Sequence, residues 1–187
     1  MPELMVIAGA NGSGKSTLTK LFPDNIPVID PDAIAREIAP EQPESAALAA
    51  GRKAIELARS YIRSNDSFIV ETTLAGNTYL NLMREVKALG WLVRLSYIGI
   101  NQPTTNIQRV QSRVKLGGHN VPRSDILRRY ERSLANLNKA AKIVDTLILY
   151  DNSTSAGHQL LATIERDRAV VYVPELPSWL SKANLNL

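Results

Sequence analysis

The chain has 187 residues, 44% of them hydrophobic and 21% charged, and a formal net charge of +4. This length suits a single domain over residues 1–187, and the zero cysteine count excludes disulfides and thiolate zinc sites. No apolar run approaches the roughly 20 residues that cross a bilayer, and residues 1–10 lack the basic start of a signal peptide. We therefore expect a cytoplasmic protein that does not contact a membrane. Aromatic residues make up only 5% of the chain and are not interleaved with basic ones, so nucleic acid is not expected as a partner.

Strand and helix patterns alternate along the chain, which predicts an α/β fold with a mainly parallel sheet flanked by helices. The five predicted strands cover residues 4–8, 27–30, 68–71, 92–100 and 146–150. Predicted helices cover about 15–21, 33–38 and 78–89. A further helix is expected to begin at a Ser45 cap, with one apolar stripe formed by Leu48, Gly51, Ile55, Ala58 and Ile62. Segment 158–173 predicts a hairpin at the sheet edge.

Residues 9–17 read GANGSGKST, directly after the first apolar run, and fit the pattern G-x-x-x-x-G-K-S/T. The glycines let the backbone curl with its N–H groups pointing inward, and the helix begun near Lys15 directs its positive dipole end at the same point. Lys15 is expected to reach the β- and γ-phosphates of a nucleoside triphosphate, and the Ser16 hydroxyl to ligate Mg²⁺. The predicted nucleotide-binding residues of this loop are Gly9, Ala10, Asn11, Gly12, Ser13, Gly14, Lys15, Ser16 and Thr17.

The rest of the chain bears on where the terminal phosphate goes. A signalling GTPase needs an N-K-x-D base reader after a strand, whereas the Asn138-Lys139 pair lies in a helix pattern. An ABC-type ATPase needs L-S-G-G-Q, of which the segment LGGHNVP keeps two glycines. A small phosphotransferase is therefore predicted. The alternatives are a polynucleotide 5′-kinase and a regulatory module that binds ATP and hydrolyses it slowly.

Carboxylates follow the second and third predicted strands, at the edge where ligands of a parallel sheet bind. Asp32 is predicted to accept the proton of the acceptor hydroxyl, unless it only caps the helix that follows. Asp30 is the second choice for that role and is expected to be buried at the strand end. Glu71 is predicted to lie near Mg²⁺ or the acceptor, unless it is a loop or capping acid. Thr72 and Thr73 are candidates to donate hydrogen bonds to the acceptor.

Segment 103–140 predicts two helices joined by a glycine turn and edged with arginines, which together form a lid over the phosphates. The predicted core stripes are Ile107, Val110 and Val114 on the first helix, and Ile126, Tyr130, Leu134 and Leu137 on the second, which Ser124 caps. Arg109 and Arg113 lie beside the first stripe and are predicted to be catalytic, because an arginine on the transferring phosphoryl group offsets its developing charge. His119 in the turn is expected to form hydrogen bonds rather than to catalyse.

The arginines of the second lid helix lie on different faces of the helix, and their predicted roles differ accordingly. Arg129 falls about 60° from Ile126 and is predicted to bind nucleotide. Arg128 and Arg132 fall on the opposite side and are expected to be solvated charges. Closing the lid would exclude water, so that the acceptor hydroxyl competes better with hydrolysis. The acceptor pocket itself is expected between the second-strand carboxylate, the helical region 33–62 and the end of the third strand.

The stretches GANGSGKST, IDPD, VETTL and GGHNVPRSDILRRYERSLANL, in this order, resemble the zeta toxin-like P-loop kinases, and most closely their short stand-alone bacterial branch. The resemblance covers about residues 4–155. It implies a P-loop kinase core that uses ATP and Mg²⁺ to phosphorylate the 3′-hydroxyl of the amino sugar in UDP-N-acetylglucosamine. It also implies that Lys15 and Ser16 are the phosphate-loop pair, Asp32 the catalytic base, and Glu71 the acid after the third strand.

In the family, two arginines beyond the fourth strand contact the phosphates. Arg109 or Arg113 matches the first of them, and Arg123 or Arg129 the second. The well-known toxins are longer and have a different lid, without the GGHNVP turn, so a kinase for another small acceptor, such as an antibiotic, a nucleoside or a sugar, is the alternative. The expected partner is a small-molecule acceptor, and an antitoxin cannot be inferred from these motifs.

Overall fold

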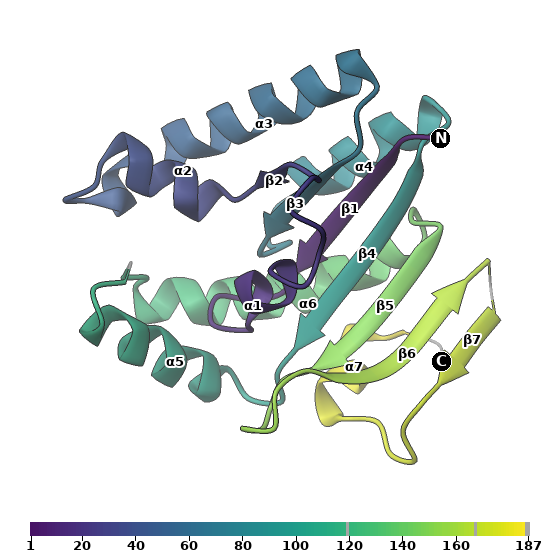
Figure 1. The fold of residues 1–187 in the computed structure, drawn as a ribbon. Coiled ribbons are helices and arrows are strands. Elements are labelled where there is room, and N and C mark those ends of the chain that lie inside the picture. Colours follow the sequence, from purple (N-terminus) through teal and green to yellow (C-terminus); the bar gives the residue numbers. More distant parts are fainter. Residues whose placement is uncertain (119, 167, 186–187) are drawn as a thin grey trace.

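The computed structural model describes residues 1–118, 120–166 and 168–185. In this part of the chain seven strands form one sheet in the order β2-β3-β1-β4-β5-β6-β7, as Figure 1 shows. The strands are β1 (Glu3–Ala8), β2 (Val28–Ile29), β3 (Phe68–Thr72), β4 (Leu92–Gly99), β5 (Thr146–Asp151), β6 (Gln159–Glu165) and β7 (Arg168–Val171). The first five are parallel, and β6 and β7 are antiparallel. The predicted α/β fold with an edge hairpin is confirmed, although residue 167 of that hairpin lies outside the described residues.

The helices lie on both faces of the sheet. They are α1 (Lys15–Thr19), α2 (Pro31–Ile38), α3 (Ala47–Ser64), α4 (Thr78–Ala88), α5 (Pro103–Lys115), α6 (Arg123–Ala141) and α7 (Ser178–Ala183), with a 3₁₀ turn η1 (Pro43–Ala46) before α3. Among the described residues, no helix combines the length and the apolar character that crossing a bilayer requires. The first predicted helix, 15–21, is shorter than expected, because α1 ends at Thr19 and a turn follows.

The central strand β1 explains why both faces are covered. Leu4, Val6 and Ala8 point to one face and join a core cluster with side chains of α3, α4, α6 and α7. Met5 and Ile7 point to the other face and pack with Leu18 of α1. A strand buried on both faces is typical of parallel sheets, so its sequence is a continuous apolar run rather than an alternating one. Figure 1 shows α1 in front of the sheet and α4 and α6 behind it.

The register of β1 and β3 positions the site. Ile7 is paired with Glu71 and Ala8 with Thr72, and the Gly9 N–H donates to the Thr72 carbonyl at 3.2 Å. The loop that follows β1 and the polar end of β3 are therefore held side by side at the carboxyl edge of the sheet. This is the edge at which ligands of open parallel sheets bind.

The predicted cap of α3 was wrong. Ser45 does not cap the helix, because it lies in η1, its hydroxyl donates to the Gln42 carbonyl, and the cap position is Ala46. The buried residues of α3 are Ala50, Ala54 and Ala58, and the larger Leu57, Tyr61 and Ile62 pack against the main core while remaining partly buried. Of the predicted stripe, Ala58 and Ile62 therefore contact the core.

The two helices of the predicted lid keep their expected core stripes. Ile107, Val110 and Val114 of α5 pack with Val121 and Ile126 in a small cluster of their own. The other predicted residues of α6, which are Tyr130, Leu134 and Leu137, join the main core. Ser124 is not the cap of α6, since the helix begins one residue earlier, at Arg123, directly after Pro122. His119 of the connecting turn lies outside the described residues.

Candidate active site

The loop between β1 and α1 is packed tightly against its neighbours at two glycines. Gly12 has φ +77°, and a Cβ there would lie 2.8 Å from the Asn106 carbonyl oxygen. Gly14 has φ +99°, and a Cβ would lie 2.6 Å from Nδ2 of Asn152 and 2.9 Å from Nε2 of His158. Both glycines therefore combine a left-handed backbone with contacts that leave no room for a side chain. Gly14 is also the N-cap of α1, so the curled loop leads directly into the helix start.

Side chains from distant segments hold this loop in place. The Asn106 amide of α5 donates to the Asn11 carbonyl at 2.7 Å. The Asn152 amide, which directly follows β5, donates to the Ser13 carbonyl at 2.8 Å. Arg129 of α6 donates to the Asn11 side-chain oxygen at 3.3 Å. The loop, including its buried Ala10 and Ser13, is thus tied to three other elements of the fold.

His158 adds a further contact, with its Nε2 lying 3.2 Å from the Gly14 carbonyl oxygen. Burial lowers the pKa of His158, the contact with Gly14 raises it, and the charge of Arg109 lowers it, for a net decrease. The imidazole is therefore neutral at physiological pH and donates its Nε2 proton to the loop. Sequence analysis did not find His158, Asn106 or Asn152. Only Asn152 had a usable signal, because it stands two residues after the end of a predicted strand.

Lys15 lies among carboxylates and contacts its own loop. Its Nζ donates to the Gly9 carbonyl at 2.9 Å and to the Ala10 carbonyl at 3.3 Å. Burial lowers the pKa of Lys15, while Asp32, then Glu71 and Asp30, act against that decrease. The ammonium group thus has negative groups on the side of the cavity and carbonyl oxygens on the side of the loop.

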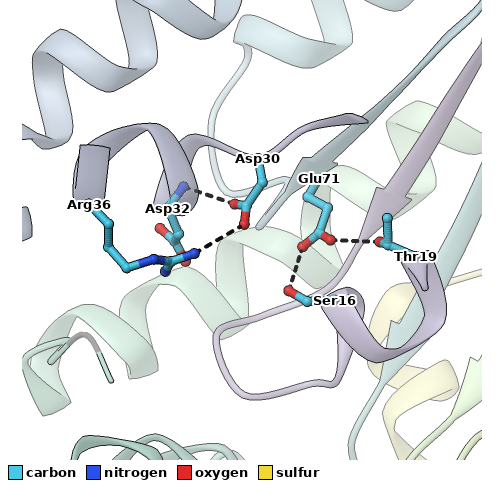
Figure 2. Close-up of polar contacts among 6 residues, drawn as sticks. All are labelled: Ser16, Thr19, Asp30, Asp32, Arg36 and Glu71. Carbon is cyan, nitrogen blue, oxygen red and sulfur yellow. Dashed lines mark hydrogen bonds and ion pairs between the residues drawn. The ribbon is translucent and has the colours of Figure 1, made fainter. Parts of the chain in front are cut away.

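Glu71 joins β3 to α1, as Figure 2 shows. Its side chain is buried; one carboxylate oxygen accepts from the Ser16 hydroxyl at 2.9 Å and the other from the Thr19 hydroxyl at 2.6 Å. Burial raises the pKa of Glu71, and the bond from Thr19 and the nearby Lys15 partly oppose this increase. Carboxylate and hydroxyl oxygens are ligands that Mg²⁺ accepts in proteins. The Ser16 and Glu71 pair therefore fits a Mg²⁺ ion bound together with nucleotide phosphates.

The two aspartates after β2 have different positions. Asp30 is the N-cap of α2: one of its oxygens accepts from the Asp32 N–H at 2.9 Å, and the other lies 3.8 Å from a guanidinium nitrogen of Arg36 (Figure 2). The capping role that we considered for Asp32 thus belongs to Asp30. Asp32 stands in the first turn of α2 and lines a cavity that Lys15 also lines.

This cavity has a volume of about 810 Å³ and lies between α2, α3, the end of β3, the start of α4 and α6. Glu71, Thr72 and Thr73 line it, and the Thr72 hydroxyl oxygen accepts from the Leu74 N–H at 3.0 Å. Tyr79 also lines it and was not predicted. Burial, and the neighbouring charge of Asp30, raise the pKa of Tyr79 to about 12, so its phenol stays protonated and able to donate.

Two of the helices that border the cavity contribute arginines to its lining. Arg52 and Arg59 come from α3, and Arg128, Arg129 and Arg132 from α6. Arg128 and Arg132 are exposed to solvent as expected, and they also line the cavity, which the sequence did not indicate. Arg128 also pairs with Asp125 at 2.6 Å.

The remaining predicted residues lie around the loop rather than in the cavity. Arg109 donates to the Thr154 carbonyl at 3.3 Å. Arg113 is exposed on α5, and its charge contributes, after burial, to lowering the pKa of Lys15. Thr17 is exposed on α1, and Arg123 is exposed at the start of α6. The roles of these side chains stay predictions.

The family model described as Zeta toxin matches residues 1–173. The chain belongs to the zeta toxin family. A Haemophilus influenzae protein described as uncharacterized is 44% identical to this family member over 123 residues, covering 65% of this chain and 88% of that one.

Solved structures with this fold include a crystal structure of the AvrRxo1-ORF1:-ORF2 complex with ATP, at a TM-score of 0.73 and 15% identity. The match covers 100% of this zeta toxin family chain, which spans 65% of the other chain's length. A second structure, of the PezAT toxin–antitoxin system of Streptococcus pneumoniae, has a TM-score of 0.59 and 20% identity, and the match covers 83% and 75% of the two chains. At these identities the likeness shows the fold alone.

Proposed function

We propose that the protein is an ATP-dependent kinase that transfers the γ-phosphate to a hydroxyl group of a nucleotide-activated sugar such as UDP-N-acetylglucosamine. The observation that carries the proposal is that Asp32 and Lys15 line the same cavity, beside the phosphate loop. The cavity volume of about 810 Å³ falls within the usual range for small-molecule sites, about 300–1,000 Å³.

On the nucleotide side, the loop N–H groups and the start of α1 would bind the phosphates, and Lys15 would exchange its loop carbonyls for phosphate oxygens. A solved relative that contains ATP supports this choice of nucleotide. Mg²⁺, which neutralises phosphate charge when bound, would be held by Ser16 and Glu71. Arg129, Arg109 and Arg113 would offset charge on the phosphates.

In the transfer itself, the acceptor oxygen forms a bond to the γ-phosphorus while the bond from that phosphorus to the leaving ADP oxygen breaks. Asp32 accepts the proton of the acceptor hydroxyl. The transition state of such transfers is loose, so positioning and charge compensation matter more than a strong base. α5 and α6 would exclude water from the reacting groups as a lid.

The lining of the cavity supports an acceptor that carries both phosphate and a ring. Arg52, Arg59 and Arg132 line the cavity, and guanidinium groups bind phosphate oxygens through paired hydrogen bonds. Leu48 and Ile55 line the same cavity, and Leu48 remains 71% exposed. A nucleotide-activated sugar would place its diphosphate near the arginines and a ring on this apolar surface.

Gly51 provides a way to test the acceptor side alone. It stands within the 18-residue helix α3 and lines the cavity, and nothing lies within 4 Å of a Cβ built there. Glycine inside a helix costs about 1 kcal/mol relative to alanine, and here no packing requires it. We expect Gly51→Leu to lower kcat/KM for the acceptor about tenfold or more by occupying ligand space, while the ATP Kd stays within about twofold.

The matched control is Ala49→Leu, which adds the same side chain at an exposed position of α3 outside the cavity lining. It should leave both constants unchanged. Equal kinetics for Gly51→Leu and wild type would show that the acceptor does not bind against this face.

The proposal as a whole is tested with terminally labelled ATP and a panel of hydroxyl acceptors: UDP-N-acetylglucosamine, other UDP-sugars, free sugars, nucleosides and aminoglycosides. We expect label in the UDP-sugar and little in inorganic phosphate, with transfer dependent on Mg²⁺. Label transferred only to water, at a rate independent of every acceptor, would contradict the proposal and favour a slowly hydrolysing regulatory module.

A further inference from the structure

The C-terminal helix α7 lies outside the residues 1–173 that match the family, yet it packs against the central sheet. Its Trp179 is fully buried and lies beside Tyr97, with ring centroids 5.6 Å apart. Gly99 at the end of β4 makes room for it, since a Cβ there would lie 2.1 Å from the indole ring. The helix is therefore fitted to the carboxyl ends of β4 and β5, the edge that carries the phosphate loop.

Trp179 is more than a packing residue, because its indole N–H donates to a buried carboxylate. Nε1 of Trp179 lies 2.9 Å from Oδ1 of Asp151. Asp151 also accepts from the Ser153 hydroxyl at 2.6 Å and from the Ser153 N–H at 3.0 Å. The Ser153 hydroxyl oxygen in turn accepts from the Asn101 N–H at 2.9 Å. The indole is thus part of a hydrogen-bonded network that fixes the chain just after β5.

Between these two fixed residues stands Asn152, whose amide donates to the Ser13 carbonyl of the phosphate loop at 2.8 Å. Asn152 is bound on its backbone side as well, because its N–H donates to the Gly99 carbonyl at 3.0 Å. One residue further from Ser153, the Thr154 carbonyl accepts from Arg109 of α5 at 3.3 Å. Segment 151–154 therefore connects α7 with the loop and with the first lid helix.

We propose that Trp179 is a positioning residue for the nucleotide. By donating to Asp151, it keeps segment 151–154 in the conformation in which Asn152 holds the phosphate loop open for phosphates. Without the indole N–H, the buried Asp151 carboxylate loses one of its hydrogen-bond donors. Leaving a buried carboxylate oxygen without a donor is costly, so segment 151–154 shifts to a conformation that supplies other donors. Nucleotide affinity then falls, while the chemistry of the bound complex does not change. The proposal rests on the proposed nucleotide site, but not on any acceptor.

The test uses the full-length protein and Trp179→Phe, which keeps an aromatic ring and removes the donor. Isothermal titration with ATP, without acceptor, should give a Kd about five- to tenfold weaker than that of wild type. KM for ATP should rise by the same factor, with kcat within about twofold. The matched control is Trp91→Phe, at the other tryptophan of the chain, which is buried against Phe68 and should leave the ATP Kd unchanged.

A double-mutant cycle separates positioning from general loosening of the fold. Asn152→Ala should weaken ATP binding by a similar factor, and adding Trp179→Phe to it should cause little further loss, because both act through one segment. Additive losses, or an unchanged ATP Kd in Trp179→Phe, would overturn the proposal. If Trp179→Phe does not fold, the fluorescence emission of Trp179 is measured in the Trp91→Phe protein instead. This emission must change when ATP is added, and an unchanged emission would overturn the proposal. ATP binding with no acceptor phosphorylated would overturn the kinase proposal and leave this one standing.

Discussion

Replacing Asp32 with asparagine should lower the rate of phosphoryl transfer at least about a hundredfold, while ATP still binds with nearly unchanged affinity. Asparagine has almost the same shape but cannot accept the proton of the acceptor hydroxyl. Because Asp30 caps α2 and Asp32 faces the cavity, the substitution leaves the helix start intact. Single-turnover transfer of labelled phosphate measures the chemical step, and calorimetric titration measures the ATP Kd.

Glu37→Gln is the matched control for this substitution. It removes one negative charge from the same helix at an exposed position outside the cavity lining, and should keep the wild-type transfer rate. A wild-type transfer rate in Asp32→Asn would mean that no proton is transferred to this carboxylate, and it would contradict the role of Asp32 as the base.

Replacing Lys15 with methionine should lower kcat/KM for ATP by roughly a thousandfold. In the proposed mechanism the ammonium group compensates charge on the β- and γ-phosphates, and methionine fills a similar volume without any charge. Two effects add in this variant: phosphate contacts are lost, and Asp32, Glu71 and Asp30 lose the positive charge that they surround. Steady-state kinetics with varied ATP measure the loss.

Lys20→Met, at the exposed C-cap of α1, provides the comparison, with the same change of charge on the same helix and no expected effect on kcat/KM. Thermal unfolding without nucleotide excludes a global loss of structure in Lys15→Met. If Lys15→Met retained more than about a tenth of wild-type kcat/KM, Lys15 would not be the residue that compensates phosphate charge.

Local patterns were sufficient for the fold and for part of the site. The apolar run of β1 and the glycine pattern after it are contiguous, so strand, loop and helix could be predicted together. Asp32 and Glu71 could be chosen as candidates because Asp32 stands shortly after a predicted strand and Glu71 is the last residue of another. In contrast, Asn106, Asn152 and His158 contact the loop from roughly a hundred or more residues away in the chain, and no local pattern contains that information.

The apolar stripe of α3 shows a limit of sequence patterns. In the structure Ala58 and Ile62 of this stripe contact the core, whereas Leu48, Gly51 and Ile55 line the cavity. Periodicity reports that one side of a helix is apolar, but not whether that side meets protein or a cavity. The polar face of α6 has the same ambiguity, since Arg128 and Arg132 are exposed and also line the cavity.

The order of the strands places the proposed binding regions of the two substrates on opposite sides of β1. The elements β2, α2 and α3, which line much of the acceptor cavity, lie on one flank, whereas the segments after β4 and β5 that brace the phosphate loop lie on the other. Donor and recipient recognition can therefore diverge separately during evolution. If the proposed function holds, grafting residues 31–64 from a homologue should redirect phosphoryl transfer to that homologue's recipient while leaving triphosphate binding intact.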